Sequence, residues 1–560
     1  MFITAKTPRI LNFLPLLLLL VSCGVAKSLK TIPDIDQYSA KTPQRIKISD
    51  SIYVSEHGRL TQNKQGLWEL YVEGNPLQIG LTTGSLTQEL FHKQEDALLT
   101  KVDEMVPSKT KQYLLCKFLA WFNRKMYLNI DNEYKTEIYG ISQYASDSYD
   151  HIADAYPRIL YLHSAHDIGH ALQDLALVGC TSFAVWGNKT PDGQLIVGRN
   201  FDFYAGDEFA KEKIIAFINP EEGHKFMSVT WGGMIGVVSG MNDQGLTVTI
   251  NAGKSKFPTA AKTPISIVTR EILQYASTIE EAVAIAKKRK VFVSESIFVG
   301  SAKDKKAAII EVSPENFGVY DIANSSQLIC SNHFQSTAYA QDKKNKDHIL
   351  ESHSQYRYDR MAELLTENTK VTPQTAVDIL RNKEGLNDKA IGYGNEKALN
   401  QLLAHHGIVF KPEELKVWVS ANPYQLGEFV AYDLNTVFQD AEKKTSKVTL
   451  ANAAMNIAAD PFQYSAAFDD YQTYRKLKEK ISIAIASGER ILPETLDALV
   501  KSNSEYWEAY YLIGRYYYEK GYYTAALNAF ERANTKEITT LPDQKRVEKY
   551  IKKLKHRLHP

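Results

Sequence analysis

The chain has 560 residues, of which 44% are hydrophobic and 23% are charged, and its formal net charge is +1. This composition is typical of a folded protein with several domains and excludes a chain that is disordered along its whole length. A net charge near zero gives no long-range attraction for a polyanion, so we expect no nucleic-acid partner.

The first 22 residues are a predicted lipoprotein signal peptide. Lys6 and Arg9 give a basic start, and residues 11–21 are apolar but shorter than the ~20 residues that a membrane-spanning helix needs. The stretch ends in Leu-Val-Ser-Cys, with Cys23 last, and resembles the bacterial lipobox. The resemblance implies lipidation of Cys23 and a membrane-anchored protein of the bacterial cell envelope, periplasmic or on the outer membrane. An ordinary cleaved signal is the alternative.

Residues 23–60 are polar, and we interpret them as a tether. Residues 61–179 are mixed but largely helical in their apolar spacing. The expected elements are a strand over residues 67–72 and helices over residues 86–105, 109–127 and 164–177. The four cysteines are too few for a disulfide framework, although one bridge between Cys116 and Cys330 is an open alternative.

Strands dominate from Cys180 onward. Turn residues at 187–193 (GNKTPDG) join strands expected over residues 180–186 and 194–203 into a hairpin. Further strands are expected over residues 213–219, 225–231, 237–241, 246–250, 293–300, 307–312, 326–331, 416–420 and 428–433, and helices over residues 265–276, 278–289, 354–366 and 373–381. This order predicts an α+β fold in which helices cover antiparallel sheets.

The last part of the chain, residues 463–560, is expected to be helical. Gly514 and Ala526 stand where small side chains let two helices approach, which is typical of a tetratricopeptide-type (TPR-like) hairpin. One such unit is recognisable. The region is therefore either a helical cap on the main domain or a module that binds a protein partner.

The residues around Cys180 indicate a specific chemistry. The hairpin returns Arg199 and Asp202 towards Cys180, and a guanidinium stabilises a thiolate. A carboxylate suits an amine, which Cys180 has only if the chain is cut after Gly179; the α-amine can then act as base for the thiol. The same residues, taken alone, also fit a buried structural cysteine beside an Arg–Asp pair.

Four blocks of sequence resemble the N-terminal-nucleophile (Ntn) cysteine hydrolases, a group that includes choloylglycine hydrolase, penicillin V acylase and acid ceramidase. Residues 180–203 (CTSFAVWGNKTPDGQLIVGRNFDF) resemble the nucleophile hairpin of the acyl-coenzyme A:6-aminopenicillanic acid acyltransferase branch, and residues 232–253 resemble its next motif. Residues 328–334 (LICSNHF) and 355–364 (QYRYDRMAEL) are shorter matches. The blocks follow the family's order within residues 180–440.

The resemblance implies a four-layer αββα fold for residues 180–440, with residues 61–179 as a propeptide. It implies self-cleavage between Gly179 and Cys180 and an amidohydrolase or acyltransferase that works through a Cys180 thioester. The implied site residues are Cys180 as nucleophile, Arg199 supporting the thiolate, Asp202 holding the amine, Asn251 and Asn332 stabilising the oxyanion, and Arg357 completing the polar network, with Arg360 as the alternative to Arg357.

We expect a small-molecule substrate with a linear N-acyl amide bond, because acyl-coenzyme A is not expected outside the cytoplasm. The resemblance implies no cofactor and no metal, and the sequence carries no signal for an oligomeric state. A catalytic zinc site at His163, His166 and His170 is a competing interpretation, but a zinc protease has Glu where Asp167 stands.

Two further alternatives use other residues or no chemistry at all. A papain-like pair of His170 with Cys180 lacks a geometric reason. A lipid-anchored scaffold would have an inactive Ntn-like body and would bind a partner through residues 463–560. The complete set of implied site residues favours the enzyme.

Overall fold

The computed structural model describes residues 24–164, 167, 179–203, 206–256, 258, 260–442 and 449–558. The predicted signal peptide with Cys23, the greater part of the helix expected over residues 164–177, and the histidines His166 and His170 lie outside the described residues.

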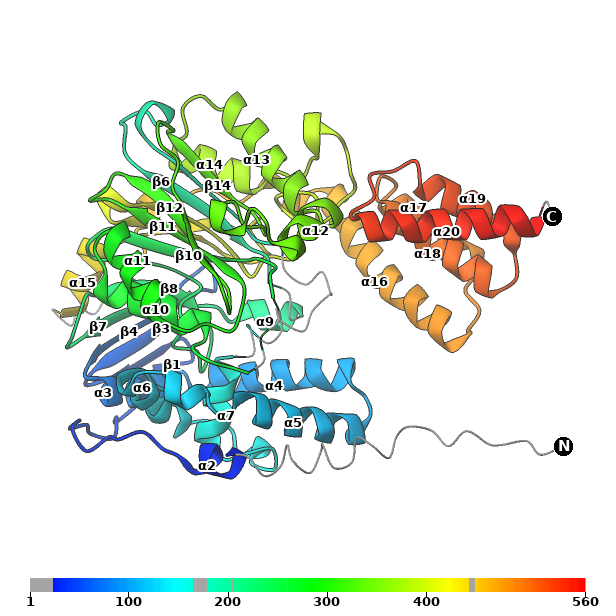
Figure 1. Ribbon diagram of the computed structural model, residues 1–560. Helices are drawn as coiled ribbons and strands as arrows, with labels where there is room; N and C mark the ends of the chain where they lie inside the picture. Colours follow the sequence, from blue (N-terminus) through cyan, green and yellow to red (C-terminus); the bar gives the residue numbers. More distant parts are fainter. Residues whose placement is uncertain are drawn as a thin grey trace.

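Two β-sheets form the centre of the molecule (Figure 1). The larger sheet has eleven strands in the order β1-β2-β3-β4-β7-β8-β9-β10-β11-β12-β13, and the smaller has six in the order β14-β5-β6-β15-β16-β17. The bounds in the larger sheet are β1 (Ile46–Ser49), β2 (Ile52–Ser55), β3 (Gly58–Gln62), β4 (Trp68–Gly74), β7 (Ile214–Pro220), β8 (Phe226–Thr230), β9 (Ser239–Asn242), β10 (Leu246–Ala252), β11 (Glu295–Ser301), β12 (Lys306–Val312) and β13 (Phe317–Tyr320). Those in the smaller sheet are β5 (Thr181–Val185), β6 (Ile196–Phe201), β14 (Gln327–Cys330), β15 (His406–Lys411), β16 (Lys416–Ser420) and β17 (Phe429–Asp433).

Alternating side chains along the strands build the layers, because successive residues of a strand point to opposite faces. In β7, Ile215 and Phe217 join the cluster that also holds Val197 and Val419 of the smaller sheet, so this cluster lies between the sheets. Ile214 belongs instead to the cluster on the helix-covered face of the larger sheet.

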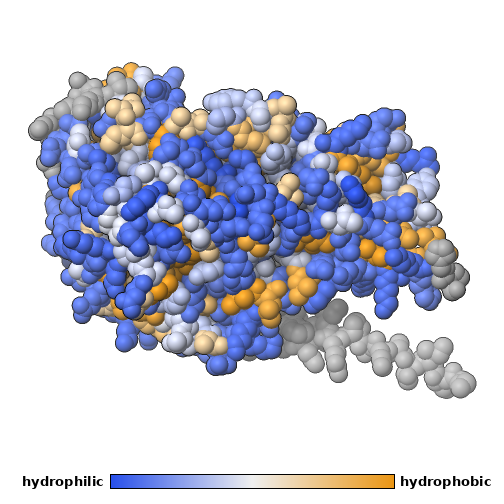
Figure 2. All heavy atoms as spheres, turned by 90° about the horizontal axis from the view of Figure 1, so that it is seen from above, coloured by the Kyte–Doolittle hydropathy of each residue, from blue (hydrophilic) through white to orange (hydrophobic). Residues whose placement is uncertain are grey.

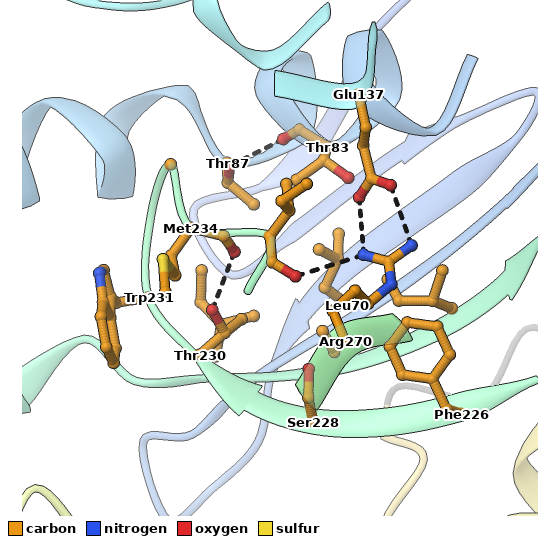
Figure 3. A pocket seen from close by; sticks show the side chains of 15 residues that line it. Leu70, Thr83, Thr87, Glu137, Phe226, Ser228, Thr230, Trp231, Met234 and Arg270 are labelled. Carbon is orange, nitrogen blue, oxygen red and sulfur yellow. Dashed lines mark hydrogen bonds and ion pairs between the residues drawn. The ribbon is translucent and has the colours of Figure 1, made fainter. Parts of the chain in front are cut away.

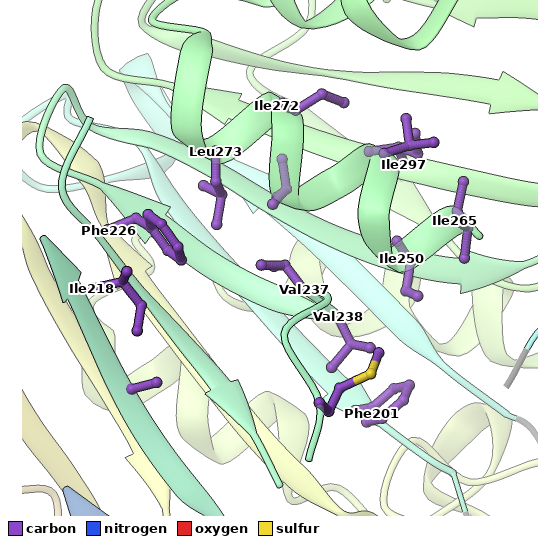
Figure 4. Packing of buried hydrophobic residues seen from close by; sticks show 14 of the residues in the cluster. Phe201, Ile218, Phe226, Val237, Val238, Ile250, Ile265, Ile272, Leu273 and Ile297 are labelled. Atoms are coloured by element: carbon purple, nitrogen blue, oxygen red, sulfur yellow. The ribbon is translucent and has the colours of Figure 1, made fainter. Parts of the chain in front are cut away.

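Helices cover both outer faces. The larger sheet packs against α3 (Pro76–Leu86), α10 (Ile265–Tyr275) and α11 (Ile279–Lys288), and Figure 4 shows side chains of α10 meeting those of β8 and β10. The smaller sheet packs against α13 (Ser354–Glu367) and α14 (Pro373–Leu380). The expected four-layer αββα arrangement is therefore confirmed.

The segment before Cys180 completes the larger sheet. β4 pairs in parallel with β7, from Trp68 beside Ile214 to Gly74 beside Pro220, although an all-antiparallel sheet was expected. β1, β2 and β3 continue the sheet outward from β4.

The tether interpretation of residues 23–60 is wrong for the strand-forming part of that range. Tyr53 and Leu60 are buried in the core, so β2 and β3 contribute apolar side chains that a solvated tether would leave exposed. The short helix α2 (Val25–Lys30) is also fixed to the body, because Ser28 Oγ lies 2.6 Å from the hydroxyl of Tyr161.

The remaining helices lie around this body. They are α4 (Gln88–Met105), α5 (Lys109–Asn123), α6 (Asn132–Ser142), α7 (Ala155–Leu162), α9 (Asp207–Lys211), α12 (Lys343–Glu351) and α15 (Leu434–Glu442). In the view of Figure 1, α4 and α5 lie below the sheets.

The C-terminal region is helical, as expected, and lies beside the layered body (Figure 1). Its helices are α16 (Ala466–Ser487), α17 (Pro493–Ser502), α18 (Trp507–Glu519), α19 (Tyr523–Ala533) and α20 (Leu541–Leu558). A Cβ at Gly514 would lie 2.8 Å from the ring of Phe530, so the small residue does permit the close approach of α18 and α19. α20 packs on the other helices through the buried side chains of Val547 and Leu554.

The visible surface is largely hydrophilic, with apolar patches separated by polar side chains (Figure 2). Within the described ranges, the structure holds no helix with the length and apolar composition that a bilayer crossing requires.

Candidate active site

Cys180 lies immediately before β5, at the start of the predicted hairpin. The hairpin register places Ser182 beside Arg199 and Thr181 beside Asn200. Asp202 follows the end of β6, and its carbonyl oxygen accepts a hydrogen bond from the N–H of Gly179 at 3.1 Å. The hairpin therefore brings Arg199 and Asp202 to Cys180, as the sequence predicts.

Arg199 is fully buried and its guanidinium spans the two sheets. Nη2 donates to Cys180 Sγ at 3.7 Å and to the carbonyl oxygen of Ile250. Nη1 donates to the carbonyl oxygen of Val238 at 3.0 Å and to Ser239 Oγ. Carbonyl groups of the larger sheet thus hold the guanidinium against the sulfur.

Burial raises the pKa of the Cys180 thiol to about 11, the positive charge of Arg199 lowers it, and the charges of Asp202 and Glu295 raise it. The thiol is therefore protonated at neutral pH in this environment. Arg199 is the group that favours the thiolate.

Asp202 has an unusual environment for a carboxylate. Its side chain is fully buried, and among the residues that the structure describes neither carboxylate oxygen has a hydrogen-bond partner. Burial raises its pKa to about 7, against the opposing charges of Arg357 and Arg199. A buried acceptor without a donor costs about 1–3 kcal/mol, more when it is charged, so the site can accommodate an additional donor.

Arg357, on α13, connects Cys180 and the start of β5 to the loop after β14. Its Nη1 donates to the Cys180 carbonyl oxygen at 2.7 Å and to Thr181 Oγ1 at 2.6 Å, and its Nη2 donates to Asn332 Oδ1 at 2.6 Å. Its Nε lies 3.2 Å from Nδ1 of His353. Burial lowers the pKa of Arg357 to about 10, so its charge persists at neutral pH.

Arg360, the alternative to Arg357, makes different contacts. Its guanidinium bonds Asn382 at 3.1 Å, Glu363 at 2.6 Å and Asp388 at 2.5 Å. Arg357 is therefore the arginine of α13 that meets Cys180.

Both predicted oxyanion residues lie beside the same strand. Asn251 Oδ1 accepts from Ser182 Oγ at 2.8 Å, and its Nδ2 lies 3.3 Å from the Cys330 carbonyl oxygen. Asn332 Nδ2 donates to the Ala252 carbonyl oxygen at 3.0 Å. The structure thus brings all six predicted site residues together.

Three polar residues near Cys180 were not found from the sequence. Ser239 Oγ lies 2.9 Å from Nε2 of His406, whose Nδ1 lies 2.9 Å from Nδ1 of His405. Burial and neighbouring cations hold the pKa of both rings far below the usual range, so both are neutral. Arg199 can only donate, so Ser239 accepts from it and can donate its own proton to His406.

An aromatic group lines the same end of the two sheets. Phe201 and Phe203 stack at 5.7 Å, and Phe209 lies 5.1 Å from Trp231. His405 packs edge-on to Phe209 at 5.4 Å. Arg199 also lies over the Phe201 ring at 4.2 Å, so the aromatic group adjoins the guanidinium that contacts Cys180.

The described part of the histidine-rich segment before Cys180 has a structural role. His163 Nε2 accepts the Ile235 N–H at 3.1 Å and its Nδ1 lies 2.9 Å from the Ile159 carbonyl oxygen, so both ring nitrogens are occupied. Asp167 accepts the N–H of Ile265 at the start of α10. These contacts fasten the segment before Cys180 to the body.

The described residues include neither a cluster of metal ligands nor a disulfide bond. Among the residues that the structure describes, no three His, Cys, Asp or Glu side chains are placed to hold a metal ion. Cys116 and Cys330 are free thiols, so the alternative of a bridge between them is wrong.

A small cavity on the helix side of the larger sheet is separate from the site (Figure 3). Arg270 crosses it to Glu137 through two hydrogen bonds of 3.1 and 2.9 Å. None of the six predicted site residues lines it.

Residues 188–423 match the model of the acyl-coenzyme A:6-aminopenicillanic acid acyl-transferase family. The match begins after Cys180 and spans the other five predicted site residues. The relationship predicted from the sequence is therefore confirmed for this part of the chain.

Curated relatives match over part of their length. An uncharacterized protein of Archaeoglobus fulgidus is 27% identical over 290 residues, 47% of this chain and 46% of its own. The N-acylethanolamine-hydrolyzing acid amidase of Caenorhabditis elegans is 27% identical over 218 residues, 37% of this chain and 59% of its own. The chain thus spans about half the length of these relatives.

Two solved structures are similar at low identity. A Caenorhabditis elegans N-acylethanolamine-hydrolyzing acid amidase ortholog is 19% identical, with a TM-score of 0.30, over 42% of this chain and 93% of its own. A mutant of the conjugated bile acid hydrolase from Clostridium perfringens is 16% identical, with a TM-score of 0.31, over 46% of this chain and 92% of its own. The layer assignment rests on the chain's own sheets.

Proposed function

We propose that the chain is an autoproteolytically activated Ntn amidohydrolase or acyltransferase, in which cleavage after Gly179 makes Cys180 the N-terminal nucleophile. The observation that carries this proposal is the unpartnered carboxylate of Asp202, buried beside Cys180. An α-amine released on Cys180 would supply the missing donor. In the described part of the uncut chain, that carboxylate has no hydrogen bond.

In the cleaved enzyme each site residue has a defined task. The α-amine of Cys180 takes the thiol proton, and Arg199 stabilises the thiolate. The sulfur attacks the acyl carbonyl, and Asn251 and Asn332 are placed to stabilise the oxyanion. Collapse of this intermediate expels the amine and leaves a thioester on Cys180, which water or a second amine resolves.

The substrate class that we propose is a linear, non-peptide N-acyl amide. The aromatic group of Phe201, Phe203, Phe209 and Trp231 suits an apolar acyl chain. The similarity of this chain to a protein named N-acylethanolamine-hydrolyzing acid amidase supports the same substrate class.

The location of the enzyme is a second part of the proposal. Lipidation of Cys23 would anchor it in the bacterial cell envelope. Replacement of Cys23 by Ala should then move the protein from the membrane fraction to the soluble fraction, and an unchanged distribution would contradict the anchor. Binding of a protein partner by residues 463–560 stays a prediction.

The decisive experiment compares residues 24–560 with their Cys180→Ala variant by denaturing gel and intact mass. We expect the wild type to give two fragments, the larger beginning at Cys180, and the variant to stay whole. If both stay whole under maturing conditions, the proposed mechanism is wrong. Turnover of acyl-coenzyme A donors alone, in a panel that includes N-acyl amides, would refute the substrate class.

A further inference from the structure

We propose that Gln401 is a catalytic residue of the self-cleavage step, in which its side-chain amide stabilises the oxyanion that forms on Gly179. This inference rests on the proposed function. It assigns to self-cleavage an oxyanion donor of its own, separate from Asn251 and Asn332.

The first observation is a direct contact with the bond to be cut. Gln401 Nε2 donates to the Gly179 carbonyl oxygen at 2.7 Å, and both residues are buried. The peptide groups on both sides of this bond are also hydrogen-bonded. Gly179 N–H donates to Asp202 O at 3.1 Å, and Arg357 Nη1 donates to Cys180 O at 2.7 Å. The carbonyl that Cys180 must attack is therefore fixed and already polarised by Gln401.

The second observation explains the glycine before the nucleophile. A Cβ at position 179 would lie 2.2 Å from Nε2 and 2.5 Å from Oε1 of Gln401. A glycine often stands at a position that needs a left-handed backbone conformation. Gly179 is not among the glycines with positive φ, so backbone freedom does not explain it. The absent side chain instead makes room for the Gln401 amide.

The loop that carries Gln401 is held in an unfavourable backbone conformation. Leu402 has φ of 54°, a left-handed value that is unfavourable for a residue with a side chain. The Leu402 N–H donates to Asn400 Oδ1 at 3.0 Å, and the Tyr471 hydroxyl lies 3.4 Å from the Leu402 carbonyl oxygen. The side chain of Leu402 packs in the cluster of the C-terminal helices. That region therefore supports the loop that reaches the cleavage point.

The reaction can be written with every atom assigned. The thiol proton of Cys180 passes to the Asp202 carboxylate as Sγ attacks the Gly179 carbonyl carbon. The Gly179 carbonyl oxygen becomes an oxyanion and keeps the hydrogen bond from Gln401 Nε2. The C–N bond then breaks, and the Cys180 nitrogen takes the proton from Asp202. Water hydrolyses the thioester, which leaves a carboxylate on Gly179 and a free thiol and amine on Cys180.

The test follows cleavage of the full chain after a pulse of cell-free translation. The variants Gln401→Met and Gln401→Glu keep the length of the side chain but remove the neutral N–H donor. We expect both to cleave about 10²–10³ times more slowly than the wild type, the usual effect of losing one oxyanion donor. Gln425→Met is the matched control, because Gln425 is equally buried and its amide has no hydrogen-bond partner among the described residues. This variant should cleave at the wild-type rate.

Cleavage rates are divided by the folded fraction, measured by resistance to limited proteolysis at each time point. If Gln401→Met or Gln401→Glu is protease-resistant and cleaves as fast as the wild type, the role of Gln401 is refuted. Equal slowing by Gln425→Met would also refute it, because the effect would then be general. A wild-type chain that does not cleave would instead refute the proposed function itself.

Discussion

The carboxylate of Asp202 allows a stability prediction with a defined size. The perturbation is Asp202→Asn in a Cys180→Ala precursor, which lacks the thiol needed for self-cleavage. Burial raises the Asp202 pKa from 3.8 to about 7, against the charges of Arg357 and Arg199. The folded chain then binds the Asp202 proton more tightly than the unfolded chain does. The stabilisation that protonated Asp202 contributes to the folded state is therefore complete below pH 3.8 and is lost as pH rises through about 7.

The gap between 3.8 and about 7 corresponds to about 4 kcal/mol, at 1.36 kcal/mol per pKa unit. About 2–3 kcal/mol of that loss falls between pH 5 and pH 8 by the same relation. The Asp202→Asn variant does not titrate at this position. The precursor with Asp202 should therefore lose about 2–3 kcal/mol more unfolding free energy over this range than the variant.

The assay is urea denaturation of both precursors at pH 5 and pH 8, with the difference between the two proteins as the result. Other titrating groups contribute equally to both and cancel. An equal pH dependence would show that the Asp202 carboxylate already has a partner in the uncut chain. The observation that carries the proposed function would then be lost.

Three further predictions concern other parts of the site. Ser239→Ala removes a hydrogen-bond acceptor of Arg199, which stabilises the Cys180 thiolate. Alkylation of Cys180 by iodoacetamide in the cleaved enzyme should therefore slow about tenfold near pH 7. An unchanged rate would show that Ser239 does not position the guanidinium. Asn332→Ala should lower kcat about 10²–10³-fold with little change in KM, and a change confined to KM would contradict its role. Burial lowers the pKa of His163 from 6.5 to about 4, so the wild type should lose up to about 3 kcal/mol as pH falls through that range. His163→Gln should lose less in urea denaturation, and equal losses would refute the role of a neutral ring.

The hairpin of β5 and β6 could be predicted from the sequence because its signals are local. The turn residues at 187–193 fix which strands pair, and a two-strand register then determines that Arg199 and Asp202 return to Cys180. β15 (His406–Lys411), at the centre of the smaller sheet, was missed. It is short and begins with His-Gly, and it is buried on both faces, so it shows no alternation of polar and apolar residues.

Gln401 could not be predicted for a different reason. It lies 222 positions from Gly179 in the sequence, in a loop without a motif. Only the folded chain brings the two together. The same holds for Ser239 and His406, whose contact joins the two sheets.

The parallel pairing of β4 with β7 has a consequence for assembly. A cut after Gly179 would turn one chain into two that share a continuous sheet, with seven paired positions from Trp68 to Gly74 on one side. Folding of the precursor is unimolecular, whereas reassembly of separated pieces would be bimolecular and would depend on protein concentration. Maturation would thus make folding a one-way process: an enzyme that unfolds after the cut at high dilution would recover slowly, and its persistence would be set by its rate of unfolding.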